Sequence, residues 1–439
     1  MAKREAILSV IYDAWGGMHP GAWRHPDAPK DPAMDFQHIK YLAQTAERGK
    51  LHAFFLADSL AYALEKDPQV LSLTSNVARF EPFTLCTALA MATQHIGLAL
   101  TASTTYSEPF NIARMFASLD HLSGGRAGWN IVTSTGEAGA NFNGFQPGRD
   151  DRYKRASEFY DVVAGLWDGL EDDAFLYDKA GGRFFDPEKI KSLNHKGEFY
   201  QVEGPLNISR PPQGHPVICQ AGSSPAGLAF ATRVAEILFT YGLDLEASKA
   251  LYKEIKTMAA ANGRDPDHIK VLPSLGIVLG HTQEEADAKL AQIDALADPQ
   301  IGIERLKGLI DYDLTPHDLD GPVPEIPETQ SWSKTMQDYY LGMAREQNLT
   351  VRQLSMMAMR FDAVAMSAQA AADHIENYVI NEAADGFNIS FADASGSLEI
   401  LVDEVVPELQ RRGVFRQDYQ GTSFREDLGI PRPSARPQP

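Results

Sequence analysis

The sequence predicts an α/β fold in which eight parallel strands close into a barrel and the helices lie outside it. Short apolar runs alternate with longer amphipathic stretches, the pattern of βα units in a parallel sheet. The apolar runs number eight, as a closed barrel requires, and five of them end in small polar residues. The predicted fold class is therefore a TIM (β/α)8 barrel.

The predicted strands are the short apolar runs, taken in chain order. They are Ala6–Tyr12, Ala53–Ala57, Ile96–Ala102, Ala127–Val132, Val217–Gln220, Ile237–Thr240, Val271–Leu279 and Phe387–Ser390.

The predicted helices lie between these strands. Asp35–Arg48 has apolar residues at positions 36, 39, 42, 43 and 46, close to the spacing of one helix face. Phe110–Leu122 follows Pro109, which suits a first helical turn, and two glycines end it. The other predicted helices are Arg152–Trp167, Ala226–Val234, Ala247–Ala261, Gln283–Leu296, Ala368–Val379 and Leu398–Arg412.

Two long segments interrupt the alternation of strands and helices. They span about residues 169–216 and 306–359, far more than an ordinary loop of about 2–6 residues. Insertions of this size in a barrel lie over the catalytic mouth or at a subunit interface. We expect one barrel domain over residues 1–430 with these two insertions, followed by a Pro-rich, mobile tail at 431–439.

The composition excludes several classes of partner and location. Acidic residues exceed basic ones by 59 to 40, a formal charge of −19, which disfavours nucleic acids and anionic membranes. The two cysteines, Cys86 and Cys219, form neither a disulfide framework nor a paired-cysteine metal motif. Because we find no signal peptide and no transmembrane run, we expect a soluble, cytoplasmic protein without a bound metal.

Polar side chains at the ends of successive strands predict a shared pocket. The carboxyl ends of barrel strands and the loops after them form the active site of this fold. The alternative is that these residues cap the helices that follow. The predicted ring consists of Asp58, Thr104, Thr105, Asn130, Ser134, Ser223 and Ser224.

The segment Gln220–Ser224 predicts a phosphate site. It follows a strand and precedes a helix, so its backbone N–H groups and two hydroxyls would lie at a helix N-terminus. Neither a Walker motif nor a dinucleotide fingerprint is present, which favours a mononucleotide such as FMN.

Tyr153 lies in a basic run and is a candidate phosphate ligand. Cations at positions 149, 152, 154 and 155 surround it, and its hydroxyl could donate to an anion. The alternative is a solvated helix start in which these cations pair with neighbouring acids.

The loop after the first strand, WGGMHPGAWRHP, is a candidate substrate wall. It contributes His19, Trp23 and Arg24 and lacks the spacing of a zinc site. Arg24 could bind a substrate carboxylate, or it could anchor the loop to an acidic side chain.

Several long motifs resemble one known family. They include AERGKLHAFFLADS, LALTASTTYSEPFNIARMFASLDHLSGGRAGWNIVTS, DRYKRASEFYDVVAGLWD and GPLNISRPPQGHPVICQAGSSPAG. Together they are similar to the nitrilotriacetate monooxygenase family, a branch of the bacterial-luciferase-like flavin monooxygenases. Its relatives act on EDTA, dibenzothiophene sulfone, long-chain alkanes and a pristinamycin intermediate, so the family includes xenobiotic-degrading enzymes. The resemblance spans about residues 5–430.

The resemblance implies a two-component monooxygenase. Such an enzyme takes up FMNH2 made by a separate NAD(P)H-dependent flavin reductase, and oxygen adds at flavin C4a to give the oxidising (hydro)peroxide. One oxygen atom then enters a small organic substrate. The resemblance also implies a homo-oligomer, and it leaves the substrate open.

The resemblance assigns roles to matching positions. Asp58 and Thr104 would lie beside the flavin, and Tyr153, Ser223 and Ser224 would contact its ribityl phosphate. Asn130 and Ser134, from the WNIVTS strand end, are the candidate catalytic residues, and Asn130 would also contact the cofactor.

Two other functions stay open. One is an F420-dependent oxidoreductase that transfers hydride without oxygen, and the other is a non-catalytic flavin-binding protein.

Overall fold

The computed structural model describes residues 4–12, 16–61, 67–75, 77–134, 136–328, 334–361, 363–393 and 396–435. Within them, parallel strands close into a barrel in the order β1, β2, β3, β4, β9, β10, β11, β13 and back to β1. The predicted barrel is confirmed, and each strand lies within one residue of its predicted bounds. The strands are β1 (Ile7–Tyr12), β2 (Ala53–Leu56), β3 (Gly97–Ser103), β4 (Ala127–Val132), β9 (Val217–Gln220), β10 (Ile237–Thr240), β11 (Lys270–Gly280) and β13 (Gly386–Phe391).

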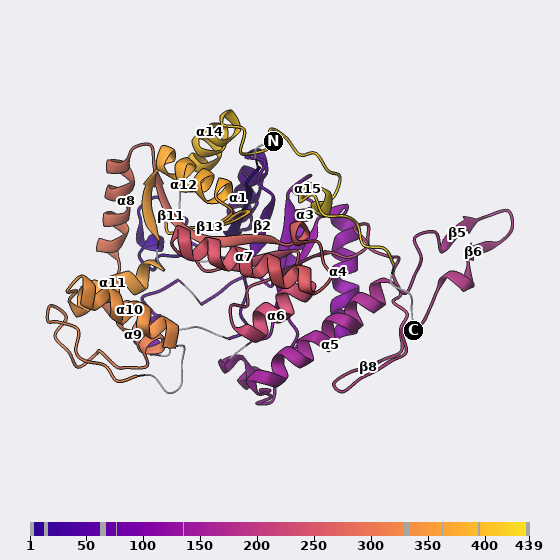
Figure 1. Ribbon diagram of the computed structural model, residues 1–439, viewed down its shortest axis with the longest axis horizontal. Helices are drawn as coiled ribbons and strands as arrows, with labels where there is room; N and C mark the ends of the chain where they lie inside the picture. Colours follow the sequence, from indigo (N-terminus) through magenta and orange to yellow (C-terminus); the bar gives the residue numbers. More distant parts are fainter. Residues whose placement is uncertain are drawn as a thin grey trace.

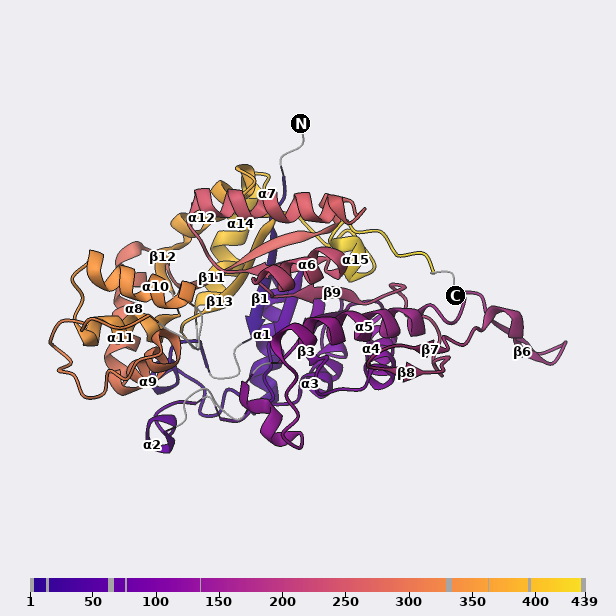
Figure 2. The ribbon, with the colours of Figure 1, turned by 60° about the horizontal axis from the view of Figure 1, so that its bottom comes forward.

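Helices cover the outside of the barrel, as Figures 1 and 2 show. Most of them begin where a side chain caps the first turn or a proline occupies it; Asp35, for example, accepts from the N–H groups of Gln37 and His38. The helices around the barrel are α1 (Phe36–Arg48), α3 (Pro82–Ala90), α4 (Pro109–Ser123), α5 (Arg149–Trp167), α6 (Pro225–Val234), α7 (Leu245–Ala261), α8 (Gln283–Leu296) and α12 (Ala368–Ile380).

Two of the differences between the predicted and the observed helices have a simple cause in the sequence. The helix α3 was not predicted, because its run PFTLCTALA is apolar on nearly every face and shows no helical stripe. The predicted helix Leu398–Arg412 consists instead of α13 (Ser397–Ile400), a π-helical turn (Leu401–Val405) and α14 (Val406–Arg411). Pro407 explains the interruption, because proline has no N–H to donate to the preceding turn.

The amino-terminal end of the barrel is closed by a short C-terminal helix, α15 (Phe424–Asp427). The Phe424 ring is fully buried, and a Cβ added to Gly97 would lie 2.5 Å from it. Inside the barrel, the rings of Phe55 and Phe239 stack at 4.8 Å. Any functional cleft must therefore be at the opposite, carboxyl end of the strands.

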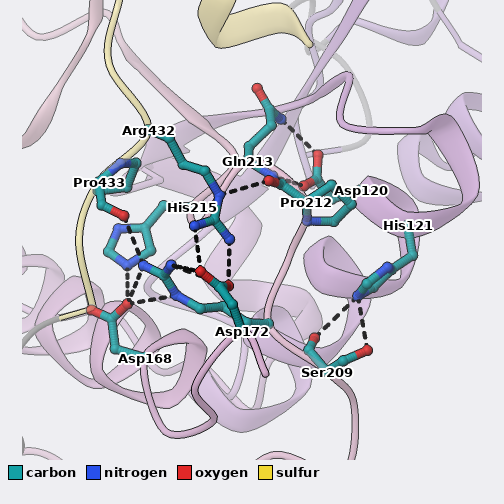
Figure 3. A network of polar contacts seen from close by, with 11 residues as sticks. Asp120, His121, Asp168, Asp172, Ser209, Pro212, Gln213, His215, Arg432 and Pro433 are labelled. Atoms are coloured by element: carbon teal, nitrogen blue, oxygen red, sulfur yellow. Dashed lines mark hydrogen bonds and ion pairs between the residues drawn. The ribbon is translucent and has the colours of Figure 1, made fainter. Parts of the chain in front are cut away.

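The first insertion, residues 169–216, lies along one side of the molecule and carries two small hairpins. These are β5–β6 (Phe175–Asp178 and Arg183–Phe185) and β7–β8 (His195–Lys196 and Gln201–Val202). The buried Arg210 guanidinium joins this segment to Asp168 at the end of α5, over 3.0 Å. Figure 3 shows the tail reaching the same network, where Arg432 pairs with Asp172. Arg210 also donates to the Pro433 carbonyl at 2.9 Å. Residues 436–439 lie outside the described part of the chain.

The second insertion, residues 306–359, is helical. It starts within α9 (Pro299–Ile310) and includes α10 (Lys334–Glu346) and most of α11 (Val351–Arg360). These helices share a small core of their own that includes Leu306, Tyr340 and Leu354. The next strand, β12 (Val364–Ser367), was not predicted and extends the sheet beside the end of β11. Nowhere in the described residues is a helix both long and apolar enough to cross a membrane.

Candidate active site

The predicted polar ring gathers at the carboxyl end of the barrel. Asp58 follows β2, Thr104 follows β3, and Ser134 follows β4. Asn130 lies within β4, and Ser223 and Ser224 connect β9 to α6. Because these strands are parallel neighbours in one closed barrel, their ends share one mouth.

Hydrogen bonds between the ends of β3 and β4 fix Thr104 and Ser134. The Thr104 backbone N–H donates to the Val132 carbonyl at 2.9 Å, and its hydroxyl donates to the same oxygen at 3.2 Å. The Ser134 hydroxyl donates to the Ser103 hydroxyl at 2.8 Å. Ser134 also has a φ of +33°, a strained backbone conformation of the kind often found at functional sites.

Asn130 presents a buried acceptor with no partner among the described residues. Its amide nitrogen donates to the Thr101 hydroxyl at 2.9 Å, but its Oδ1 atom makes no hydrogen bond there. The side chain is buried, and an unsatisfied buried acceptor costs about 1–3 kcal/mol. An N–H donor of a bound ligand would therefore be stabilised at this point.

Tyr153, Ser223 and Ser224 converge at the N-terminus of α6. The Ser224 hydroxyl accepts from the Gly227 N–H at 3.1 Å, which leaves its own O–H free to donate outward. A Cβ added at Gly222 or Gly227 would lie 2.9 or 2.8 Å from the Tyr153 hydroxyl. Two glycines thus let the phenol approach the helix end. The hydroxyls of Tyr153, Ser224 and the exposed Ser223 together form a compact cradle for an anion.

The basic run around Tyr153 does not converge on this cradle as a whole. Lys154 pairs with Asp151 at 3.6 Å on the helix surface, as the solvated alternative expects. The Arg155 guanidinium faces away, stacked against the rings of Phe199 and Tyr200 at 5.1 and 5.2 Å.

The first insertion contributes Tyr200 to the mouth, a residue that was not predicted from the sequence. The Tyr200 hydroxyl donates to the Thr104 carbonyl at 3.3 Å and accepts from Arg155 at 3.2 Å. Glu158 of α5 holds this segment by accepting from the Tyr200 N–H and pairing with His195. Burial acts to raise the pKa of Glu158, but these hydrogen bonds outweigh it and lower that pKa. The local sequence EFYQVEG does not indicate this long-range contact.

Asp58 has a cationic neighbour, Arg79, that was not predicted from the sequence either. Arg79 Nε lies 3.4 Å from Asp58 Oδ1, and both side chains are mostly buried. Burial raises the pKa of Asp58, and the Arg79 charge offsets part of this effect. The pair places a carboxyl group beside a cation at the edge of the mouth.

The three predicted substrate residues all have anchoring contacts. His19 is 1% exposed, and its Nε2 lies 3.1 Å from Asp294 Oδ1. Trp23 donates to the Leu73 carbonyl at 3.2 Å and remains 38% exposed. Arg24 donates to the Leu296 carbonyl, so its anchor is a backbone oxygen rather than an acidic side chain. Contact of these residues with a substrate stays a prediction.

Asp393 is a further buried acid at this end of the barrel. It follows β13 and lines a cavity of about 60 Å³ together with Tyr12, Phe54 and Ser397. Burial raises its pKa to about 6 from an ordinary 3.8, although the nearby Ser397 and the charge of Lys289 offset part of the effect. Between these two pH values the unfolded chain loses its proton while the folded chain keeps it. Stability therefore falls as pH rises through this window.

We expect Asp393→Asn to stabilise the protein above pH 6, because the amide mimics the protonated acid and removes the cost of a buried charge. The gain should approach at most about 3 kcal/mol near pH 7.5 and vanish near pH 4. Urea unfolding from pH 4 to 8 measures it. Asp27→Asn, at a side chain that is 81% exposed, is the control. Parallel pH profiles for Asp393→Asn and the parent would contradict this assignment.

A closed β/α barrel with polar side chains and a candidate anion site at its mouth is the architecture of a TIM-barrel enzyme. The model of the luciferase-like monooxygenase family matches residues 18–379, and the chain belongs to that family. It is an enzyme, a flavin-dependent monooxygenase, and the predicted resemblance is confirmed.

Individual relatives match over nearly the whole chain. The sequence is 46% identical to N-acetyl-S-(2-succino)cysteine monooxygenase of Bacillus subtilis (strain 168), with 98% of each chain covered. It is also 46% identical to nitrilotriacetate monooxygenase component A of Aminobacter aminovorans, again covering 98% of each. A solved riboflavin lyase with modified FMN and riboflavin superposes with a TM-score of 0.85 at 31% identity, covering 97% of this chain and 96% of that one.

Proposed function

We propose that the protein is the oxygenase component of a two-component monooxygenase that uses FMNH2 supplied by a separate NAD(P)H-dependent flavin reductase. When bound, reduced FMN supplies the two electrons that reduce O2, so that one oxygen atom enters the substrate and the other leaves as water. The name "component A" of the Aminobacter relative supports a division of labour of this kind.

The observation that carries this proposal is the cradle at the N-terminus of α6. Tyr153, Ser223 and Ser224 provide three hydroxyls there, and Gly222 and Gly227 let the Tyr153 hydroxyl approach the helix end. The second fitting feature is the unpaired Oδ1 of Asn130, an acceptor for a ring N–H of the flavin. The residues present therefore fit FMN.

The other residues of the polar ring position the cofactor and exclude water from the site. Thr104 and Ser134 are held by hydrogen bonds between β3 and β4, and Asp58 lies on the neighbouring strand end. Asn130 is in register with Cys219, which belongs to the apolar cluster inside the barrel. The apolar cluster would therefore lie beneath the flavin ring and exclude water there. Exclusion of water favours transfer of oxygen to the substrate over release of peroxide.

For the substrate, we propose a small organic molecule with at least one carboxylate and a carbon–sulfur or carbon–nitrogen bond. The two relatives at 46% identity are named for substrates of this chemistry. In this proposal the exposed face of Trp23 contacts the carbon skeleton and the exposed Arg24 contacts a carboxylate. The buried His19 holds the loop through Asp294 instead.

We expect turnover only when NADH, FMN, oxygen and a flavin reductase are all present. A panel of N-acetyl-S-(2-succino)cysteine, nitrilotriacetate, dibenzothiophene sulfone and a long-chain alkane is assayed by oxygen consumption and by 18O incorporation into product. The carboxylated compounds should be preferred, and samples without reductase should be inert.

Two outcomes of the same assay would contradict the proposal. Oxygen-independent turnover with reduced F420 would identify a hydride-transfer enzyme. Tight flavin binding without any oxygen consumption across a wider panel would identify a flavin-binding protein. A preference for the alkane would leave the oxygenase function intact and reject the carboxylate contact of Arg24.

A further inference from the structure

The cavity beside Asp393 lies outside the barrel wall, beneath α1 and α13. Its lining residues come from the carboxyl ends of β1, β2 and β13 and from these two helices. Val10 and Phe54 belong to the apolar cluster on the outer face of the strands, whereas Phe55, the next residue of β2, packs inside the barrel. The FMN cradle follows β9, across the barrel from β1, so the cavity is a separate site.

The Asp393 carboxyl group is buried at this cavity without a partner. Neither of its two oxygens makes a hydrogen bond among the described residues. The nearby Ser397 hydroxyl accepts from the Leu279 N–H at 2.8 Å. The nearest cation, Lys289, is bound elsewhere: its Nζ donates to the Leu279 carbonyl and pairs with Glu285, each at 3.0 Å. A buried carboxylate in this state requires a proton or a bound cation.

The other titratable groups at the cavity favour a cation. Glu399 of α13 lines it and accepts from the Tyr41 hydroxyl at 2.8 Å, so a second carboxylate lies at the same site as Asp393. His38 of α1 also lines it, and burial lowers the pKa of His38 although the charges of Asp35 and Glu399 act in the opposite direction. The imidazole is therefore neutral at pH 7, and the lining has a net negative charge.

The walls of the cavity suit a cation that carries alkyl groups. Aromatic faces and aliphatic side chains attract an alkylated ammonium through dispersion and cation–π contacts. The cavity volume of about 60 Å³ holds about four to six waters, or an organic cation of about four heavy atoms. The apolar wall residues are Val10, Tyr12, Leu42, Phe54, Phe391 and Leu398.

We propose that this cavity binds a small alkylammonium ion, which pairs with the Asp393 carboxylate. The site lies directly behind the loop that follows β1. In that loop the Met18 N–H donates to the Phe391 carbonyl at 2.9 Å, and the His19 N–H donates to the Ala392 carbonyl at 3.2 Å. A bound cation therefore stabilises the base of this loop. The binding itself is independent of the proposed function.

The test measures binding of trimethylammonium by saturation-transfer NMR of its methyl protons, at pH 7.5 and constant ionic strength. The protein needs no flavin or reductase for this experiment, so its outcome is separate from that of the oxygenase assay. We expect a saturable signal that methylammonium displaces. Tetrabutylammonium, which is too large for the cavity, and potassium, which has no alkyl groups, should displace it at least tenfold less effectively.

Asp393→Asn should raise the dissociation constant of trimethylammonium at least tenfold, because the amide carries no charge. The variant should fold, since it is expected to be more stable than the parent at this pH. Asp27→Asn, at a side chain that is 81% exposed, is the matched control and should bind like the parent.

The pH dependence of binding provides a second readout. Protons compete with the cation at Asp393, whose pKa is about 6, so the affinity of the parent should fall about tenfold between pH 7 and pH 5. His38, Glu399 and Lys289 are the other titratable groups near this carboxyl, and a proton gained by His38 would act in the same direction. Absence of saturable binding up to about 50 mM, equal affinity in Asp393→Asn and the parent, or equal displacement by potassium would each overturn the proposal.

Discussion

Replacing Gly222 by alanine is expected to weaken the binding of reduced FMN by about a hundredfold or more. The new Cβ would lie 2.6 Å from Gln220 Nε2, 2.9 Å from Gly227 Cα and 2.9 Å from the Tyr153 hydroxyl. Since Gly227 belongs to the first turn of α6, the clash must move either the helix end or the phenol. Each lost hydrogen bond to a charged phosphate costs about 1.5–3 kcal/mol, and two such losses account for the predicted factor.

Anaerobic titration with reduced FMN measures this affinity, and circular dichroism verifies that the variant is folded. Gly308→Ala is the control, because a Cβ at that position meets nothing within 4 Å. Ser223→Ala is a milder second variant, which removes one hydroxyl from the cradle without a clash. If Gly222→Ala and Ser223→Ala both bind reduced FMN like the parent, the phosphate does not lie at the N-terminus of α6.

Arg126→Ala is expected to cause the largest loss of stability, about 4 kcal/mol or more. The buried guanidinium donates five hydrogen bonds at the amino-terminal end of the barrel. Its acceptors are the carbonyls of Ala90, Thr93, Ile96 and Ser123 and the Thr93 hydroxyl, which join α3, β3 and α4. Removing the donor leaves several buried acceptors unsatisfied, each at a cost of about 1–3 kcal/mol, while any water that enters the space recovers part of it.

Urea unfolding at pH 7 measures this loss. Arg114→Ala, at an exposed position on α4, is the matched control and should change stability by no more than about 0.5 kcal/mol. The flavin affinity of folded Arg126→Ala should remain close to that of the parent, because the residue lies at the opposite end of the barrel from the cradle. Equal unfolding midpoints for the two variants would show that the carbonyls find other partners.

The sequence by itself determined the fold class and most of the strand bounds. Buried parallel strands appear as short apolar runs, such as Val217–Gln220, and this signal is local to each run. The polar residues that end these runs, from Asp58 to Ser224, could be assigned to one pocket because the barrel topology brings all strand ends together. The helix α3 was not predicted from the sequence, because a helix with apolar residues on nearly every face has no periodic stripe.

Only the tertiary structure decided which distant segments meet at the mouth. Tyr200 contacts the Thr104 carbonyl, and Arg79 pairs with Asp58, although neither residue lies in a motif that local pattern could assign to the site. Their positions depend on how long loops and an insertion fold back onto the barrel, and such contacts leave no periodic trace in the sequence. The same reason applies to the β5–β6 hairpin: the sequence shows that residues 175–185 are rich in aromatic side chains, but only the fold shows that Tyr177 and Phe184 are 62% and 63% exposed.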